Sequence, residues 1–282
     1  LAHTLEYGIT AAFERADQAL QVTVDEVRRW NADPRHDDRE LDALLEHQLQ
    51  RARGLQALII TDKDGRLRYG TGVDRDSTTS IADRAYFAQA RDNPSSGLLI
   101  SEPGRGKLTG RPQIVLARRI PCADGGFCGV VFTPLYLDQL DQLFAGLDVG
   151  PGGLISVRNN ASALLARYPA LAGPQGQPGH VAVSPKLAQI RETGVDEAAY
   201  VADSPVDGIS RLLFYRRFPE IPVYVLLGRS MDDALAGWRS EAITTVSIIG
   251  LLMLLLGLAL WQFHRVWQQE QDFRQRMIES IP

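Results

Sequence analysis

The apolar positions of this chain fall into three patterns, and the longest is a continuous run near the C-terminal end. No charged residue occurs between Ala242 and Phe263. A helix over the first 20 of these residues would be about 30 Å long, enough to cross the hydrocarbon core of a membrane. Two tryptophans and two arginines lie near its ends, where interfacial anchors occur: Trp238, Trp261, Arg239 and Arg265. The pattern predicts a membrane span, because a helix buried in a soluble protein would need apolar neighbours on every side.

The first 31 residues show a second pattern, with apolar residues at alternating three- and four-residue steps and no proline before Pro34. These positions are Leu5, Ile9, Ala12, Ala16, Leu20 (or Ala19), Thr23, Val27 and Trp30. They predict a long helix with a narrow apolar seam. A seam of this width suits packing along another helix, in this chain or in a dimer mate, or packing on the domain that follows. A second helix is expected from Asp38 to Arg53, with Gly54 as its C-terminal cap.

After Gly54 the apolar residues form the short, β-branched runs that are typical of strands. Leu55 to Thr61 and Leu67 to Tyr69 are expected to form a hairpin around the turn Asp62 to Gly65. That turn lacks the remaining ligands of a calcium loop, so a plain turn is expected. A helix over Ser80 to Ala90 follows, and then strands over Leu98 to Ser101, Gln113 to Ile120 and Gly129 to Thr133.

The second half of the chain repeats the first. Leu58-Ile-Ile-Thr and Leu154-Ile-Ser-Val lie 96 positions apart, each followed by a turn and a return strand. Leu116 to Pro121 and Phe214 to Pro219 lie 98 positions apart, which places Arg216 where Arg118 stands in the first half. Periods of this size indicate two similar α/β units in tandem, unless the match arose by chance. The shared arginine suggests an architectural role, and the joint is expected around Gly146 to Gly153.

Charge adds little to this picture. The 282 residues carry 30 basic and 34 acidic side chains, for a formal net charge of −4, and the acidic surplus lies before the apolar run. This balance does not favour a nucleic-acid partner. The basic residues on either side of the run slightly favour a cytoplasmic tail after it. Because no signal peptide is visible, we expect an earlier span to precede Leu1 in the parent protein.

The two cysteines bear on the compartment. Cys122 and Cys128 flank the turn-rich sequence Ala-Asp-Gly-Gly-Phe between two apolar runs, so they could face each other across a hairpin. A disulfide there fits an oxidising compartment, and two buried free thiols are the alternative. A metal site is not favoured, since no histidine is close in sequence.

No motif of enzyme chemistry is evident. Gly104 to Gly110 looks superficially like a phosphate loop, but it lacks the required Gly-x4-Gly-Lys-Ser/Thr spacing. There is no Gly-x-Ser-x-Gly elbow and no His-Glu-x-x-His, and the five histidines are scattered. We therefore expect no catalytic residues, no metal and no cofactor in these residues.

Taken together, the long first helix, the two tandem units, the string Asp83-Arg84-Ala85-Tyr86-Phe87, the Gly-rich segment before Arg118-Arg119 and the exit into a span resemble one family. They resemble the double Cache sensor domains, also called PAS-like or PDC sensors, which are the extracytoplasmic parts of bacterial histidine kinases, diguanylate cyclases and chemoreceptors. The resemblance covers roughly residues 1 to 240. It implies an α+β fold: a long N-terminal helix, two PAS-like units with antiparallel sheets, and one transmembrane helix.

The resemblance also implies a ligand site in the first, membrane-distal unit, with Arg84 and Tyr86 facing the pocket. An arginine offers a planar fork to a carboxylate, and a tyrosine hydroxyl can add a directed hydrogen bond. Further candidates lie in or beside the strands that would roof the pocket: Ser101, Thr109, Arg111 and Arg118. Each arginine among them could instead be solvated or paired on a sheet face. The amino-acid-binding branch of the family has an Arg-x-Trp-type string, where this chain has Tyr86-Phe87.

The expected domains are N-terminal helices (1–53), a membrane-distal unit (54–146), a membrane-proximal unit (147–236), a transmembrane helix (237–263) and the start of a cytoplasmic linker helix (264–282). The expected function is extracytoplasmic sensing of an organic acid or amino acid by an inner-membrane receptor, a homodimer with its leading region in the periplasm. The output, a diguanylate cyclase, phosphodiesterase or histidine kinase, would follow Pro282. The alternative is a structural or dimerisation ectodomain without a ligand.

Overall fold

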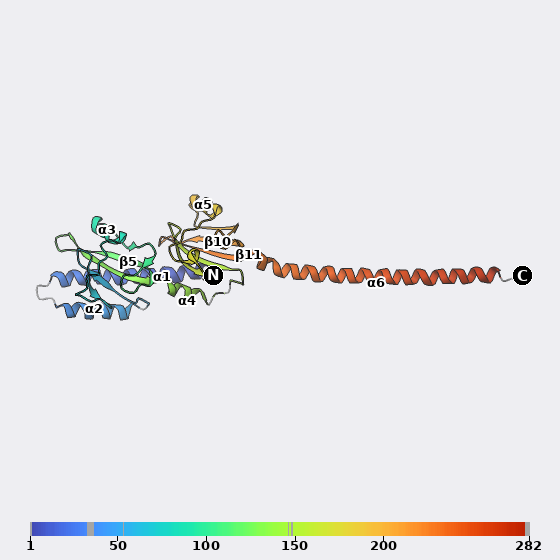
Figure 1. Ribbon diagram of the computed structural model, residues 1–282, viewed down its shortest axis with the longest axis horizontal. Coiled ribbons are helices and arrows are strands. Elements are labelled where there is room, and N and C mark those ends of the chain that lie inside the picture. Colours follow the sequence, from blue (N-terminus) through green and yellow to red (C-terminus); the bar gives the residue numbers. More distant parts are fainter. Residues whose placement is uncertain (1, 33–36, 53, 146, 148, 280–282) are drawn as a thin grey trace. The chain divides into compact units, whose positions relative to one another are not determined.

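The computed structural model describes residues 2–32, 37–52, 54–145, 147 and 149–279, and it divides into two compact parts, Leu1–Ser230 and Met231–Pro282 (Figure 1). The first part holds two antiparallel sheets and five α-helices among the described residues. The second part is a single helix.

The first sheet has the strand order β2-β1-β6-β5-β3, with β4 paired to β5. Its strands are β1 (Ile59–Thr61), β2 (Leu67–Gly70), β3 (Leu99–Ile100), β4 (Gly104–Arg105), β5 (Pro112–Pro121) and β6 (Phe127–Tyr136). The second sheet has the order β8-β7-β11-β10-β9. Its strands are β7 (Leu154–Asn159), β8 (Leu164–Tyr168), β9 (Glu197–Asp203), β10 (Ser210–Arg217) and β11 (Val223–Ser230).

The two sheets share one topology. In each, a hairpin comes first and its opening strand pairs with the last strand of the sheet. A short helix, α3 (Ala85–Asp92) or α5 (Pro185–Glu192), follows the hairpin in sequence. The repeated arginine strings fall in β5 and β10, which hold the same place in their sheets. The expected α+β fold with two PAS-like antiparallel units is confirmed.

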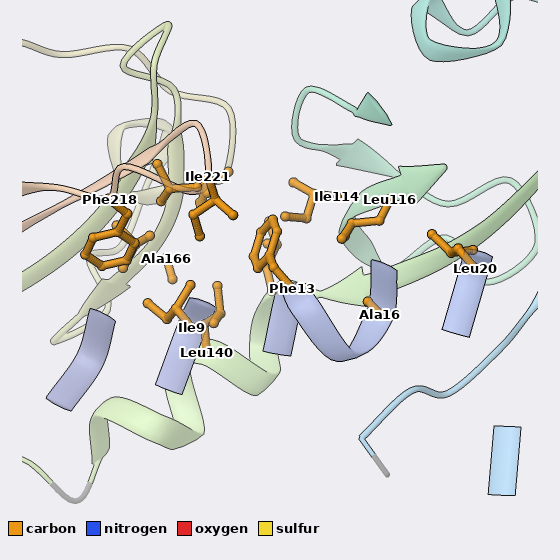
Figure 2. Packing of buried hydrophobic residues seen from close by; sticks show 14 of the residues in the cluster. Ile9, Phe13, Ala16, Leu20, Ile114, Leu116, Leu140, Ala166, Phe218 and Ile221 are labelled. Atoms are coloured by element: carbon orange, nitrogen blue, oxygen red, sulfur yellow. The ribbon is translucent and has the colours of Figure 1, made fainter. Parts of the chain in front are cut away.

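Helix α1 (Ala2–Ala32) lies along both sheets and provides their common core. One stripe of its side chains is buried, at Leu5, Ile9, Phe13, Ala16, Leu20 and Val27. These residues belong to one cluster with Ile114 and Val131 of the first sheet and Ile155 and Val225 of the second. Figure 2 shows Phe13 between Ile114 on one side and Ile221 on the other. The two units therefore share a core.

This packing decides a question that the sequence left open: the seam of α1 lies on the sheets of its own chain. One seam position was wrong, because the buried residue after Ile9 is Phe13, while Ala12 is only half-buried. Both positions fit a helical period, but the space between the sheets takes a large aromatic side chain, and burying it contributes more than burying a methyl group.

Two further helices complete the core. Helix α2 (Asp38–Arg51) buries Leu41 and Leu45 in the same cluster, and the Asp37 carboxylate caps it by accepting a hydrogen bond from the Arg39 N–H. Helix α4 (Leu137–Ala145) begins directly after β6 and contacts β8 of the second sheet. Its Leu140 lies near Ala166 in Figure 2.

Paired charges fasten α1 to each sheet at equivalent positions. The Arg118 guanidinium of β5 donates to both carboxylate oxygens of Asp17, at 2.5 and 2.9 Å. The Arg216 Nε of β10 donates to Glu6 Oε2 at 2.7 Å. The expectation that Arg118 and Arg216 share an architectural role therefore agrees with their contacts. Asp17 and Glu6 are 11 residues apart, about three helical turns, so they lie on the same side of α1.

Helix α6 (Met231–Glu279) follows β11 without an intervening residue. Its segment Glu241–Gln262 has a mean hydropathy of 2.5 and is the one helix in the described chain that is long and apolar enough to cross a membrane. At 22 residues it would measure about 33 Å.

Several sequence expectations fall outside the described residues. They are the cap region at Arg53, the positions Gly146 and Asp148 of the joint, the last residues 280–282, and the side chains of Trp238, Arg239 and Arg265.

Replacing Arg118 by Met should lower the free energy of unfolding by about 1–3 kcal/mol, because a partly buried Asp17 would lose its cationic partner and keep only the Gln21 amide as a donor. Urea denaturation of the full chain in detergent micelles, followed by circular dichroism, measures this. The matched control is Arg28→Met, whose pair with Asp25 is exposed on the same helix and should change stability by less than about 0.5 kcal/mol. Equal effects of the two substitutions would show that the Arg118–Asp17 pair contributes no more to the free energy of unfolding than an exposed ion pair does.

Candidate functional site

A cavity of about 510 Å³ lies on the face of the first sheet that points away from α1. Successive side chains of a strand point to opposite faces of its sheet, so one face packs on α1 and the other lines the cavity. On β5, Ile114 and Leu116 face α1, whereas Val115 faces the cavity. Helix α3 and the segment from Ile100 to Thr109 enclose it.

The floor of the cavity is apolar and its rim is polar. The floor residues come from the sheet and the hairpin: Ala57, Ile59, Leu67, Ile81, Val115 and Phe132. The charged lining residues are Asp83, Arg84, Glu102, Arg105 and Lys107. A cavity of this size with few polar groups is typical of small-molecule sites.

Among these charged residues, Arg84 and Arg105 form no ion pair with a carboxylate within the described residues. The Lys107 ammonium donates to Asp83 Oδ1 at 2.6 Å, and this hydrogen bond lowers the pKa of Asp83. The Arg84 guanidinium donates only to the Arg105 carbonyl oxygen, at 3.0 Å, and within the described residues no carboxylate lies within 4.0 Å of it. Arg84 is the N-cap residue of α3, and its guanidinium has no acceptor with which to cap the helix N–H groups.

Tyr86 also lines the cavity and carries a hydroxyl that no other group of the described residues uses. Its side chain is 6% exposed and its ring packs at 6.3 Å from that of Phe132. Across the described part of the chain, no group hydrogen-bonds its hydroxyl, and burial raises the pKa of Tyr86. A neutral phenol with a free donor therefore lines the cavity.

Two of the other expected residues line the cavity with hydroxyls that already have partners. The Ser101 hydroxyl accepts a hydrogen bond from the Val115 N–H at 2.9 Å and donates to the Glu102 carbonyl oxygen at 2.9 Å. The Thr109 hydroxyl oxygen accepts from the Arg111 N–H at 3.3 Å. Ser101 extends the pairing of β3 with β5, so its first role is structural.

Arg111 and Arg118 do not line the cavity, which corrects the expectation that they would roof it. Arg118 has the same strand parity as Leu116 and points to α1. Arg111 lies over the ring of Tyr136, at 4.0 Å from its centroid, and donates to Asp138 at 2.5 Å. It contacts the outer side of a residue that lines the cavity.

The role of the segment Glu102 to Lys107 in lining the cavity was not predicted, because the segment was expected to be only a Gly-rich link. This segment lines the cavity and also reaches the second unit, because Asn159 Nδ2 at the end of β7 donates to Glu102 Oε2 at 2.6 Å. The concentration of charge between the glycines was the available signal.

The structure contains a disulfide between Cys122 and Cys128, with sulfur atoms 2.06 Å apart, in the turn between β5 and β6. Within the described residues, no three His, Cys, Asp or Glu side chains gather where they could hold a metal ion. The Asp62 carboxylate accepts hydrogen bonds from the N–H groups of Asp64 and Arg66, as in a plain turn.

The sequence matches no family profile and no curated protein sequence. Its structure is similar to the extracellular domain of rpHK1S-Z16, described as a histidine kinase, with a TM-score of 0.71, 29% identity, and coverage of 84% of this chain and 94% of that one. The ligand-binding domain of the Pseudomonas fluorescens chemoreceptor CtaA, in complex with L-alanine, gives a TM-score of 0.55 at 18% identity, over 83% of this chain and 96% of that one.

The ligand-binding domain of the Pseudomonas aeruginosa amino-acid chemoreceptor PctC, in complex with GABA, has a TM-score of 0.58 at 16% identity and covers 81% of this chain and 96% of that one. These three domains share the two-unit arrangement that the sheets and α1 form here. This chain therefore has the double Cache-type fold of the extracellular ligand-binding domains of the histidine kinase and chemoreceptors to which it is similar.

Proposed function

We propose that the cavity of the first sheet binds a small carboxylated molecule and that Arg84 holds its carboxylate. The observation that carries this proposal is the Arg84 guanidinium, which lines the cavity with only a backbone carbonyl as its partner. A guanidinium can give two parallel hydrogen bonds to a carboxylate, and these charge-assisted bonds are stronger than neutral ones.

The Tyr86 hydroxyl would add a directed hydrogen bond, since it lies in the same cavity without a partner of its own. The apolar floor would take the carbon skeleton of the ligand, and burial of that surface would supply much of the affinity. Lys107 is a weaker candidate for the carboxylate, because it is paired with Asp83.

Both organic acids and amino acids belong to the proposed ligand class. Two of the similar domains are in complex with L-alanine and with GABA, which carry an amine as well as a carboxylate. In this chain Glu102 is the acidic lining residue without a basic partner, and its contact is the amide of Asn159. A ligand amine would bind near the Glu102 carboxylate, so its binding would change the hydrogen bond that Asn159 donates to Glu102.

The rest of the proposal concerns transmission. We propose that α6 crosses the inner membrane, with residues 1–236 in the periplasm and residues 264–282 starting a cytoplasmic linker. A cyclase or kinase output would follow. Support comes from the apolar segment Glu241–Gln262 and from the direct continuation of β11 into α6.

Homodimerisation is part of the proposal, and exposed Tyr7 and Val22 of α1 offer apolar surface for it. A ligand acts only through its different affinity for two packings of these elements.

A thermal-unfolding screen of organic acids and amino acids on the full chain in detergent should find at least one stabilising compound. Arg84→Ala should weaken its binding about 10- to 100-fold, the usual loss for a charge-assisted hydrogen bond. Arg111→Ala is the matched control and should bind as the wild type does, because Arg111 lies outside the cavity. A screen without hits would favour a structural or dimerisation ectodomain, and a hit that is indifferent to Arg84 would refute the assignment of that residue.

Removal of the Tyr86 hydroxyl and removal of the Ser101 hydroxyl should have different effects on stability and ligand binding. Tyr86→Phe should leave the free energy of unfolding within about 0.5 kcal/mol, since the hydroxyl has no partner, but should weaken ligand binding about five-fold. Ser101→Ala should cost about 1 kcal/mol of stability, because the Val115 N–H loses its acceptor. Urea denaturation and ligand titration measure the two effects, and a reversed order would contradict the proposed roles.

Reporter fusions after Glu279 test the orientation. A green fluorescent protein fused there should fluoresce in bacterial cells, whereas an alkaline phosphatase at the same point should be inactive, because it needs the oxidising periplasm to form its disulfides. Active phosphatase with a dark fluorescent protein would reverse the proposed topology.

A further inference from the structure

The second sheet has its own cavity at the place that corresponds to the first one. Its volume is about 40 Å³, and it lies between the outer face of the sheet, α5 and the segment Asp203 to Val206. On β7, Ile155 and Val157 face α1, so Ser156 and Arg158 face the cavity. Its lining combines apolar residues, among them Leu154, Leu187, Leu213 and Leu226, with polar and charged ones: Ser156, Arg158, Arg167, Ser184, Tyr200 and Asp203.

Three arginines on this face are almost completely buried. Arg158 is 4% exposed, Arg167 is 7% exposed and Arg211 is 2% exposed. A single partly buried carboxylate, Asp207, pairs with two of them. Arg211 donates to its two oxygens at 2.8 and 2.9 Å, and Arg167 donates to Oδ2 at 2.6 Å. The hydrogen bonds from Arg211 and Ser204 outweigh burial and lower the pKa of Asp207. The carboxylate is therefore ionised and neutralises one of the three cations.

Two positive charges therefore remain, and Arg158 at the cavity carries one of them. Arg158 donates to the carbonyl oxygens of Ser162 and His180, at 2.7 and 3.4 Å, and within the described residues no carboxylate lies within 4.0 Å of it. Burial, and to a lesser extent the neighbouring Arg167, lower the pKa of Arg158. An uncompensated charge in a protein interior is costly unless a counter-charge joins it.

Three buried polar atoms at this cavity have no hydrogen-bond partner among the described residues: the Tyr200 hydroxyl, the Arg167 Nε–H and the Ser156 hydroxyl. Ser156 and Arg167 form a cross-strand pair of β7 and β8. Buried polar groups in proteins nearly always have a partner. Both residues line the same cavity, so one occupant could satisfy both.

Arg119 in the first unit shows what a purely structural buried arginine looks like here. It donates to the carbonyl oxygens of Ala90, Arg91 and Gly125, and it lies over the ring of Phe127 at 5.0 Å. It lines neither cavity. Arg158 differs from Arg119, because it has a second cation, three unpartnered polar atoms and a small cavity beside it.

We propose that the cavity of the second sheet binds a small monovalent anion, held by Arg158, the Arg167 Nε–H and the Ser156 hydroxyl. Its volume has room for about three water molecules, which fits an anion of the size of chloride, formate or acetate and excludes ligands that would fill the first cavity. Asp203, at the exposed edge, disfavours anions of higher charge.

The test is thermal unfolding of the full chain in detergent at constant sodium concentration. Gluconate, which is too large for the cavity, is replaced stepwise by acetate, formate or chloride. At least one of them should raise the melting temperature saturably, by roughly 5 °C at a concentration 100-fold above the dissociation constant. Arg158→Met should abolish the response. Its melting temperature in gluconate should be equal to or above that of the wild type, because a surplus buried charge has been removed.

Two control variants separate this site from other effects of the anions. Arg119→Met removes a buried arginine away from the cavity and should keep the response, and Arg84→Met removes the proposed anchor of the first cavity and should keep it as well. Ser156→Val provides a second, milder test, since it removes a hydroxyl and narrows the cavity, and it should weaken the response at least about ten-fold. The proposal fails if no anion exceeds gluconate, if Arg158→Met or Ser156→Val responds as the wild type does, or if Arg84→Met alone loses the response.

Discussion

The packing of a single helix against two sheets is the constraint on which the rest of this structure depends. The buried stripe of α1, from Leu5 to Val27, joins the inner faces of both sheets in one core. The pairs Arg118–Asp17 and Arg216–Glu6 hold the helix at equivalent points of the two sheets. Because α1, α2 and α4 pack on the inner faces, the outer faces remain open to binding, and the two cavities described above lie there.

Much of this architecture could be predicted from the sequence. The seam of α1 and the repeated strings at Leu116 and Phe214 gave the long helix and the two similar sheets, because burial imposes a period on the apolar residues. It was harder to predict to which face of its sheet each residue points. Arg118 and Arg119 are adjacent and chemically identical, yet one pairs with α1 and the other donates to carbonyl oxygens of the α3 segment on the opposite face. A shift of one residue exchanges the faces of a strand, and short apolar runs do not determine that register.

The two outer faces show how one topology can hold two kinds of chemistry. In the first unit, Ile59, Val115 and Phe132 leave a wide cavity with an apolar floor, with the cations at its rim. In the second, Arg158 and Arg167 lie on the sheet itself, together with the buried rings of Tyr200, Tyr215 and Tyr224 in the neighbouring cluster. Large side chains fill most of the space there, and the small cavity that remains has buried arginines in its lining. The repeat in the sequence revealed the common fold, whereas the difference in function lies in residues that face away from the shared core.

The path between the two faces is short. Glu102 lines the first cavity and accepts a hydrogen bond from Asn159, and Asn159 follows Arg158, which lines the second. Asn159 also accepts a hydrogen bond from the Ala163 N–H, so it fixes the turn that supplies the Ser162 carbonyl oxygen to Arg158. A ligand that draws Glu102 away would therefore loosen the end of β7. That strand pairs with β11, and β11 continues directly into α6, so a change at the first cavity has a continuous hydrogen-bonded route to the last strand before the apolar helix.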